Sequence, residues 1–162
     1  MNEITYKTTK EGINWQEVAG VLHRSGLSDR SPEEQETIFK NSYAVVFVYH
    51  KDTIVGVGRA ISDGVCQAAI YNIALDGEYQ GLGIGRKLIM GLLDQLKGQN
   101  IILYTHPRTV SLYEKMGFRR SKTAMCRFAG SEESLNWMDR EGFLLPEKYR
   151  FEEENGREDR KR

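Results

Sequence analysis

Three largely apolar runs occupy the middle of the chain. They span Tyr43–His50, Thr53–Ile61 and Val65–Leu75, and the short turn sequences Lys51-Asp52 and Ser62-Asp63-Gly64 separate them. Apolar runs of this length, bounded by Asp, Ser and Gly, are typical of β-strands joined by tight turns. The pattern therefore predicts three consecutive antiparallel strands.

Helical periodicity with capping residues flanks these strands. Asn14, with Glu three residues on, predicts a helix over 15–24, and Ser31 followed by Pro and Glu predicts a second over 32–41. After the strands, Arg86–Leu96 places its aliphatic side chains on one helical face. The order of elements so far is two helices, three strands and a third helix.

Weaker patterns complete the fold. Four further elements are expected: a first strand over Ile4–Thr8, a short buried strand over Ile101–Tyr104, a short helix over Thr109–Lys115, and a last strand over Lys122–Phe128. A helix precedes the strand at Ile101, so this strand is expected to run parallel to its neighbour. The predicted class is α/β, with a mixed, mostly antiparallel central sheet flanked by helices.

A glycine-rich turn, Gln80-Gly81-Leu82-Gly83-Ile84-Gly85, joins the third central strand to the helix that follows. Glycines at every second position let the backbone adopt positive φ and let a ligand approach the main chain. Unpaired N–H groups and the helix dipole make such a turn an anion site, beside which Arg86 and Lys87 add charge. The spacing matches neither a Walker loop nor a G-x-G-x-x-G fingerprint. A turn that serves only strand–helix packing is the alternative.

The turn resembles the acyl-CoA signature Gln-x-x-Gly-x-Gly of the GNAT superfamily of N-acetyltransferases. A second block, Ser111-Leu112-Tyr113-Glu114-Lys115-Met116-Gly117-Phe118, is similar to the family segment L-Y-x-K-x-G-F and follows in the expected order. The resemblance covers about Ile4–Phe128 and implies a GNAT domain over 1–128. It also implies transfer of an acetyl group from acetyl-CoA to a primary amine by direct attack in a ternary complex.

The resemblance assigns the cofactor to a set of backbone groups. Those of Ile73, Ala74 and Leu75 would lie along the pantetheine arm of coenzyme A, on a strand that splays from the next one in this family. The pyrophosphate would be held by the turn and the first helical residues, Gln80, Gly81, Leu82, Gly83, Ile84, Gly85 and Arg86.

Tyr113 matches the family tyrosine that protonates the departing thiolate of coenzyme A. A phenol suits this role because it is neutral at pH 7 and can donate to a sulfur anion. The resemblance thus names Tyr113 as general acid and as a cofactor contact. A core tyrosine that only packs its ring is the alternative.

The sequence departs from the family pattern where a general base is expected. Many relatives carry Glu on the strand before the glycine turn, whereas this strand offers only Tyr71 and Asn72. Asn72 cannot act as a base but could orient a water. His106 stands where many relatives have Asn, and it is a candidate base or cofactor contact or a solvated loop residue.

The acceptor amine is expected near two loops. Arg59-Ala60-Ile61-Ser62-Asp63-Gly64 resembles a turn found in small bacterial and plastid GNAT proteins that act on amines. The loop Ser25–Arg30 corresponds to the region where relatives build the acceptor pocket. Asp63, Asp29 and Arg30 are therefore substrate candidates, and turn-capping is the alternative for both aspartates.

Composition limits the other partners. The chain has 162 residues with 23 basic and 23 acidic side chains, which gives no support for nucleic-acid or membrane-surface binding. Cys66 and Cys126 form no metal-spaced cluster, so no metal is expected, and both are expected to be buried free thiols. No secretory signal and no membrane-span pattern is found, which favours a cytoplasmic location.

Residues after the predicted sheet divide into two parts. The stretch 129–151 contains Trp137, Phe143 and Leu145, so it is expected to dock on the body or to join a second subunit in a homodimer. The stretch 152–162 is charged throughout and is expected to be a disordered tail.

Two functions from different classes follow from these observations. The first is acetyl-CoA-dependent N-acetylation of a small-molecule or protein amine. The second is a binding module that senses acyl-CoA without turnover, which the missing Glu would favour and the intact Tyr113 opposes.

Overall fold

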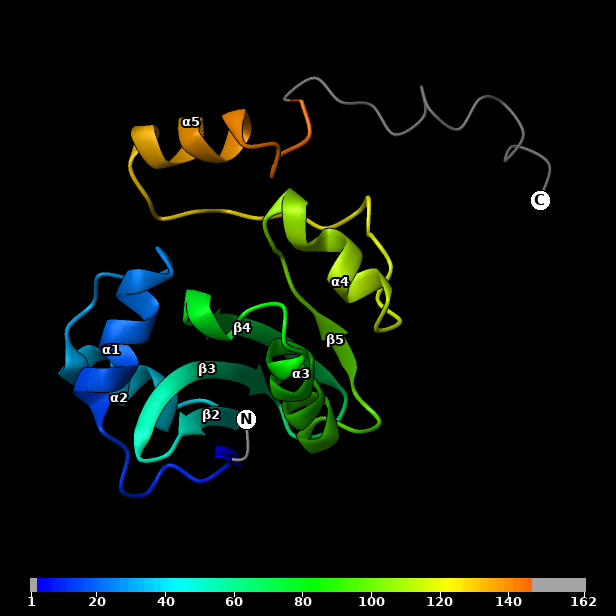
Figure 1. Cartoon of the computed structure of the whole chain (residues 1–162). Coiled ribbons are helices and arrows are strands. Elements are labelled where there is room, and N and C mark those ends of the chain that lie inside the picture. The colour runs from blue at the N-terminus through cyan, green and yellow to red at the C-terminus, as the bar shows by residue number, and fades with distance from the viewer. Residues whose placement is uncertain (1–2, 147–162) are drawn as a thin grey trace. The chain divides into compact units, whose positions relative to one another are not determined.

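The computed structural model describes residues 3–146, and the chain forms two compact units, Met1–Leu103 and Tyr104–Arg162. The first unit is built on a five-stranded sheet in the order β1-β2-β3-β4-β5 (Figure 1). Its strands are β1 (Ile4–Lys7), β2 (Ala44–His50), β3 (Thr53–Ser62), β4 (Gln67–Leu75) and β5 (Asn100–Ile102). Strands β1 to β4 pair antiparallel, and β5 pairs parallel to β4. The predicted α/β class and mixed sheet are confirmed.

Strand β2 is covered on both faces. All its residues except His50 are buried, because the side chains alternate between two layers of helices. Val45, Phe47 and Tyr49 belong to the aromatic and aliphatic core on one face. Val46 lies on the other face, where a Cβ built on Gly91 of α3 would come 3.1 Å from it.

Helices α1 (Trp15–Arg24) and α2 (Pro32–Lys40) pack on the face that carries Phe47. Each begins at the cap that the sequence predicts: the Asn14 side chain accepts from Glu17, and Ser31 with Glu34 forms a capping box. Trp15 and the buried Phe39 both contact the ring of Phe47. The caps thus fix where the helices start, and the aromatic cluster fixes which sides they bury.

Helix α3 (Ile84–Gln95) packs on the opposite face. Gly58 of β3 permits this packing, because a Cβ there would lie 2.6 Å from Leu88 and 2.8 Å from Ile73. The helix starts two residues earlier than predicted, since Gly83 rather than Gly85 is its N-cap. A short 3₁₀ turn, η1 (Gly77–Tyr79), precedes the glycine turn.

The second unit contains the 3₁₀ turn η2 (Pro107–Thr109) and helices α4 (Val110–Glu114) and α5 (Glu132–Arg140). Ser131 caps α5 by accepting from Ser134, and Gly142 at φ +80° ends it. Beyond α5, the Phe143 ring lies 5.5 Å from that of Trp137 and 5.3 Å from that of His106. The described part of the stretch after residue 128 therefore packs on the loop before α4.

Three expectations about this region and the thiols need correction. Lys122–Phe128 forms no strand: it has no strand partner among the described residues, and its side chains are exposed except for the half-buried Phe128. Cys66 and Cys126 are free, as expected, but exposed rather than buried. The parallel strand is confirmed, yet it ends at Ile102, excludes Tyr104 and is not buried, since Ile102 is 68% exposed.

The predicted tail, 152–162, lies outside the described residues, as do 147–151 of the predicted docking stretch. Over residues 3–146, no helix is long and apolar enough to cross a bilayer.

Candidate active site

Strand β4 is the element on which the site is built, because its two edges are occupied differently. On one side it pairs with β3 along nearly its whole length. On the other side it pairs with β5 only from Gln67 to Ala69. Among the described residues, the edge from Ile70 to Leu75 therefore has no strand partner on the β5 side. This is the splay that the resemblance implies, and within residues 3–146 it leaves the β5-side edge of β4 beyond Ala69 without a strand partner.

A β-bulge interrupts β4 at the start of this open edge. Val57 pairs with Ala74 and Arg59 with Tyr71, so Asn72 and Ile73 lie opposite Gly58 alone. Asn72 has φ +53°, in the left-handed region that few residues other than glycine and asparagine adopt. The bulge interrupts the regular ladder with β3 beside the splay, and pairing resumes at Ala74.

The glycine turn begins where β4 ends. Gly81 and Gly83 have φ of +75° and +78°, and a Cβ built on either would meet no atom within 4 Å. Gly85 needs no special φ, and its Cβ would be 3.8 Å from Leu75. Gln80 donates to the backbone oxygen of Leu75 at 2.9 Å and so ties the turn to the end of β4. The positive φ angles thus require glycine at 81 and 83, whereas at 85 the closeness of the helix to Leu75 is the one feature that favours glycine.

The start of α3 offers the donors of an anion site. Its N-cap Gly83 has no capping side chain, and the first bond to the Gly83 oxygen comes from Lys87 at 3.3 Å. The N–H groups of Ile84, Gly85 and Arg86 precede that bond and have no partner within the helix. Leu82, Arg86 and Lys87 are exposed. Uncovered donors, open space at two glycines and nearby positive charge fit a phosphate group.

Tyr113 lies in α4, in the second unit. It is only 8% exposed, and the ring of Phe118 stands at 85° to it with 5.7 Å between centroids. Phe118 also donates its backbone N–H to the backbone carbonyl oxygen of Tyr113 at 3.1 Å, so the Gly-Phe end of the second block packs back on the tyrosine. Burial raises the pKa of Tyr113 above its usual value, and a hydrogen bond with Thr105 lowers it in part. The phenol therefore keeps its proton at neutral pH.

His106 has structural partners on both ring nitrogens. Its Nδ1 accepts from the N–H of Arg108 at 3.1 Å and so caps η2. A nitrogen that accepts carries no proton, so the Nε2 atom is the donor toward Glu141, at 3.3 Å. These contacts favour a role in holding the segment after α5 over a role as general base.

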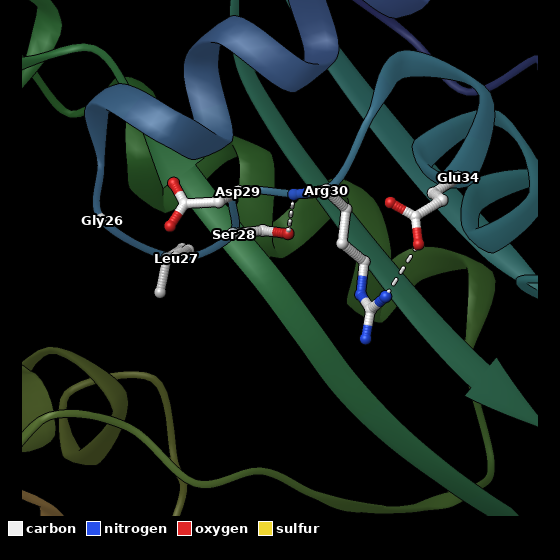
Figure 2. A pocket seen from close by; sticks show the side chains of 6 residues that line it. All are labelled: Gly26, Leu27, Ser28, Asp29, Arg30 and Glu34. Carbon is white, nitrogen blue, oxygen red and sulfur yellow. Dashed lines mark hydrogen bonds and ion pairs between the residues drawn. The ribbon is translucent and has the colours of Figure 1, made fainter. Parts of the chain in front are cut away.

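The candidate acceptor loop forms a shallow polar hollow between α1 and α2. Gly26, Leu27, Ser28, Asp29, Arg30 and Glu34 line it. Figure 2 shows the side chains of Asp29 and Arg30 pointing apart, with Arg30 directed toward Glu34. Asp29 is paired with His23, with 2.7 Å between Oδ1 and Nδ1, and both side chains are largely exposed. The loop brings opposite charges to one surface, but both charged candidates already have partners.

Asp63 serves the turn between β3 and β4. Its Oδ1 accepts from the N–H groups of Val65 and Cys66 at 2.8 Å and of Gln67 at 3.1 Å. These bonds hold the pKa of the carboxyl at about 2. A carboxylate with three backbone donors on one oxygen favours the turn-capping role over recognition of an amine.

Residues 9–132 match the family model for an acetyltransferase (GNAT) domain. The chain belongs to the GNAT acetyltransferase family. It is 31% identical to GCN5-related N-acetyltransferase 1, chloroplastic, of Arabidopsis thaliana, over 69% of this chain and 59% of that protein. It is 36% identical to serotonin N-acetyltransferase 2, chloroplastic, of Oryza sativa subsp. japonica, over 44% of this chain and 37% of that protein. The chain thus matches less than two thirds of the length of either relative.

A solved structure of a putative acetyltransferase from Deinococcus radiodurans superposes with a TM-score of 0.70. It covers 78% of this GNAT chain and 89% of the other at 24% identity, and this likeness shows the fold.

Reasoning from the sequence missed two polar residues in contact with the predicted site residues. Arg59 appeared only as the start of a turn, yet it contacts both Tyr71 and Asn72. Thr105 was not named, yet it hydrogen-bonds with Tyr113. The available signal for Arg59 was a charged residue near the end of an otherwise apolar strand.

Proposed function

We propose that the protein transfers the acetyl group of acetyl-CoA to a primary amine, with Tyr113 as the general acid. The observation that carries the proposal is the open edge of β4, which leads directly into an uncovered glycine turn at the start of α3. Acetyl-CoA, when bound, supplies an acetyl thioester. The turn would hold its pyrophosphate, and the backbone of Ile73–Leu75 its amide-containing arm.

In this proposal, the Tyr113 hydroxyl stays protonated until the reaction and then donates its proton to the departing thiolate of coenzyme A. Its raised pKa keeps the phenol neutral until well above neutral pH, so it can donate and does not compete as a base. The hydrogen bond with Thr105 would stabilise the phenolate that donation leaves behind.

The proton of the attacking amine must be removed without the help of a carboxylate on β4. That strand, Gln67–Leu75, contains no Asp or Glu. Asn72 cannot accept a proton, and His106 uses both ring nitrogens elsewhere in the second unit. We therefore propose that the amine binds in its neutral form and that water removes its proton.

The acceptor is proposed to be a primary amine of a small molecule, with a protein amine as the alternative. The name of one relative, serotonin N-acetyltransferase, supports a small aromatic amine. The acceptor loop is shallow and polar, which leaves room for an amine on a larger carrier.

The test is a thiol-release assay with acetyl-CoA and a panel of serotonin, tryptamine, spermidine and a lysine-containing peptide. We expect amine-dependent thiol release with at least one member, and mass spectrometry should find the acetylated amine. Tight binding of acetyl-CoA with no release on any amine would support the sensing module instead. Absence of both binding and release would contradict the proposed cofactor.

A further inference from the structure

Arg59 is held at three points on the face of the sheet that also carries Val45, its partner on β2. Its Nε donates to Asn72 Oδ1 at 2.6 Å, and its Nη1 donates to Ser42 Oγ at 3.3 Å. The guanidinium carbon lies 5.1 Å from the centroid of the Tyr71 ring. Ser42 is 2% exposed and donates its own hydroxyl to the oxygen of Ile38 at 2.8 Å. Because the serine hydrogen is used for Ile38, its oxygen accepts from Arg59, and each hydrogen bond of this cluster has one donor and one acceptor.

The contact with Arg59 determines how the Asn72 amide is oriented. A guanidinium has donors and no acceptor, so the amide atom that faces it must be the oxygen. The Asn72 nitrogen, Nδ2, then points away from Arg59. Within residues 3–146, this nitrogen has no hydrogen-bond partner, and Asn72 is only half-buried. Arg59 thus leaves a free N–H₂ donor on the bulge, at the start of the open edge of β4.

We propose that Arg59 is a positioning residue that presents the Asn72 amide as a hydrogen-bond donor to an oxygen at the reacting centre. That oxygen belongs either to the bound acyl group or to a water beside the amine. The inference rests on the proposed acetyl transfer, because the bulge adjoins the edge that would hold the acetyl-CoA arm. A second consequence is that Asn72→Asp does not create a useful base, because a carboxylate beside the Arg59 guanidinium stays ionised and poorly basic.

Kinetics separate a positioning role from a purely structural one. Asn72→Asp keeps the size of the side chain and its contact with Arg59 but removes the donor. We expect its kcat to fall about tenfold, the typical effect of one hydrogen bond lost from the transition state. Arg59→Gln should lower kcat by a similar factor, and Arg59→Lys by less, because it keeps one charged donor. The affinity for acetyl-CoA should change by less than about threefold in all of them.

A double-mutant cycle tests whether Arg59 acts through Asn72. Asn72→Gly keeps the left-handed backbone without a side chain. If Arg59 acts through the amide, Arg59→Gln costs at most about twofold more in kcat once residue 72 is glycine. Additive losses would overturn the proposal. Lys97→Gln, which removes an exposed charge paired with Asp94 at 3.3 Å, is the matched control and should leave kcat unchanged.

A measurement without turnover keeps the test independent of the proposed function. The side-chain N–H₂ resonances of Asn72, assigned by their loss in Asn72→Asp, should shift in Arg59→Gln. A shift on adding acetyl-CoA but not coenzyme A identifies the acyl oxygen as the partner, and a shift only after the amine is added identifies the water. Resonances that respond to none of these additions would overturn the donor role. Thiol release absent from the parent protein would instead contradict the proposed acetyl transfer.

Discussion

At the scale of single residues, the two side chains proposed to assist the reaction are both hydrogen-bond donors. Tyr113 keeps its proton because burial raises its pKa, and Asn72 presents an amide nitrogen because Arg59 occupies its oxygen. The two aspartates proposed from the sequence have other partners: Asp63 caps a turn and Asp29 pairs with His23. Phenol and amide donors suit stabilisation of developing negative charge.

Tyr113→Phe tests the general acid, since it removes one hydroxyl and little packing. We expect kcat to fall by about 10²-fold or more, the usual worth of a positioned proton donor. The Kd for acetyl-CoA should change by less than about tenfold, because the glycine turn would supply most of the binding energy. In the parent, the raised pKa means that loss of the phenol proton should not limit kcat below about pH 10.

Tyr43→Phe is the matched control for this variant. Tyr43 is 50% exposed and its ring packs near Gly64, so its hydroxyl should not affect kcat. A Tyr113→Phe enzyme with parental kcat would show that water protonates the leaving group. Equal losses in affinity and kcat would make Tyr113 a packing residue.

At the scale of elements, the proposed function depends on β4, because the pairing of this strand changes along its length. Its first residues are ordinary sheet, its middle carries the bulge, and its end leads into the glycine turn. The sequence predicted the strand, the turn and the helix, because alternation and glycine spacing are local signals. It could not predict the bulge at Asn72, because one extra residue in a ladder depends on the register with β3, which is set by packing across the sheet.

Gly83→Val tests the glycine turn. Gly83 has φ +78°, and an added side chain would project into open space where the pyrophosphate is proposed to lie. A β-branched residue at positive φ costs roughly 1–3 kcal/mol of strain, so stability should fall. We expect the affinity for coenzyme A, measured by calorimetry on the folded protein, to fall by far more than the strain explains.

Gly98→Val separates strain from occlusion. Gly98 follows the same helix at its other end, has φ +83°, and also has no atom within 4 Å of a built Cβ. It should lose similar stability and keep its affinity for coenzyme A. If both variants bind coenzyme A like the parent, the cofactor does not lie on this turn.

At the scale of the whole molecule, the sequence predicted the first unit better than the second. In the first unit, every strand from β2 to β4 has a neighbour on each side and helices on its faces, so local patterns and tertiary packing agree. In the second unit, Lys122–Phe128 contains a short apolar run, but its side chains are exposed except for the half-buried Phe128. A short apolar run becomes a strand only where a neighbouring strand supplies the hydrogen bonds, and within residues 3–146 this segment has no such neighbour. Met125 is accordingly 93% exposed.

The last prediction concerns the segment after residue 128, whose contacts were not predictable in detail. Phe143 packs on His106 and Trp137, Gly142 lies near Pro107, and Glu141 pairs with His106. His106 also caps η2, and the hydroxyl of Thr109, the last residue of η2, lies 2.7 Å from that of Thr105, the hydrogen-bond partner of Tyr113. Loss of the segment should therefore loosen the loop that precedes the proposed acid.

A chain that ends at Phe128 should melt about 3–8 °C lower than the parent, because it loses aromatic burial worth about 1–3 kcal/mol. Its kcat should fall more than its affinity for acetyl-CoA, since the affected loop supports Tyr113 and not the glycine turn.

A chain that ends at Phe151 keeps Phe143 and the described contacts, so it is the matched control and should resemble the parent. Phe143→Ala in the full chain should reproduce most of the loss in melting temperature, which would assign it to the contacts of Phe143 with His106 and Trp137. Light scattering on each protein shows whether the assembly state changes as well. If the chain ending at Phe128 matches the parent in melting temperature, kcat and assembly, the segment neither stabilises the second unit nor positions its loop.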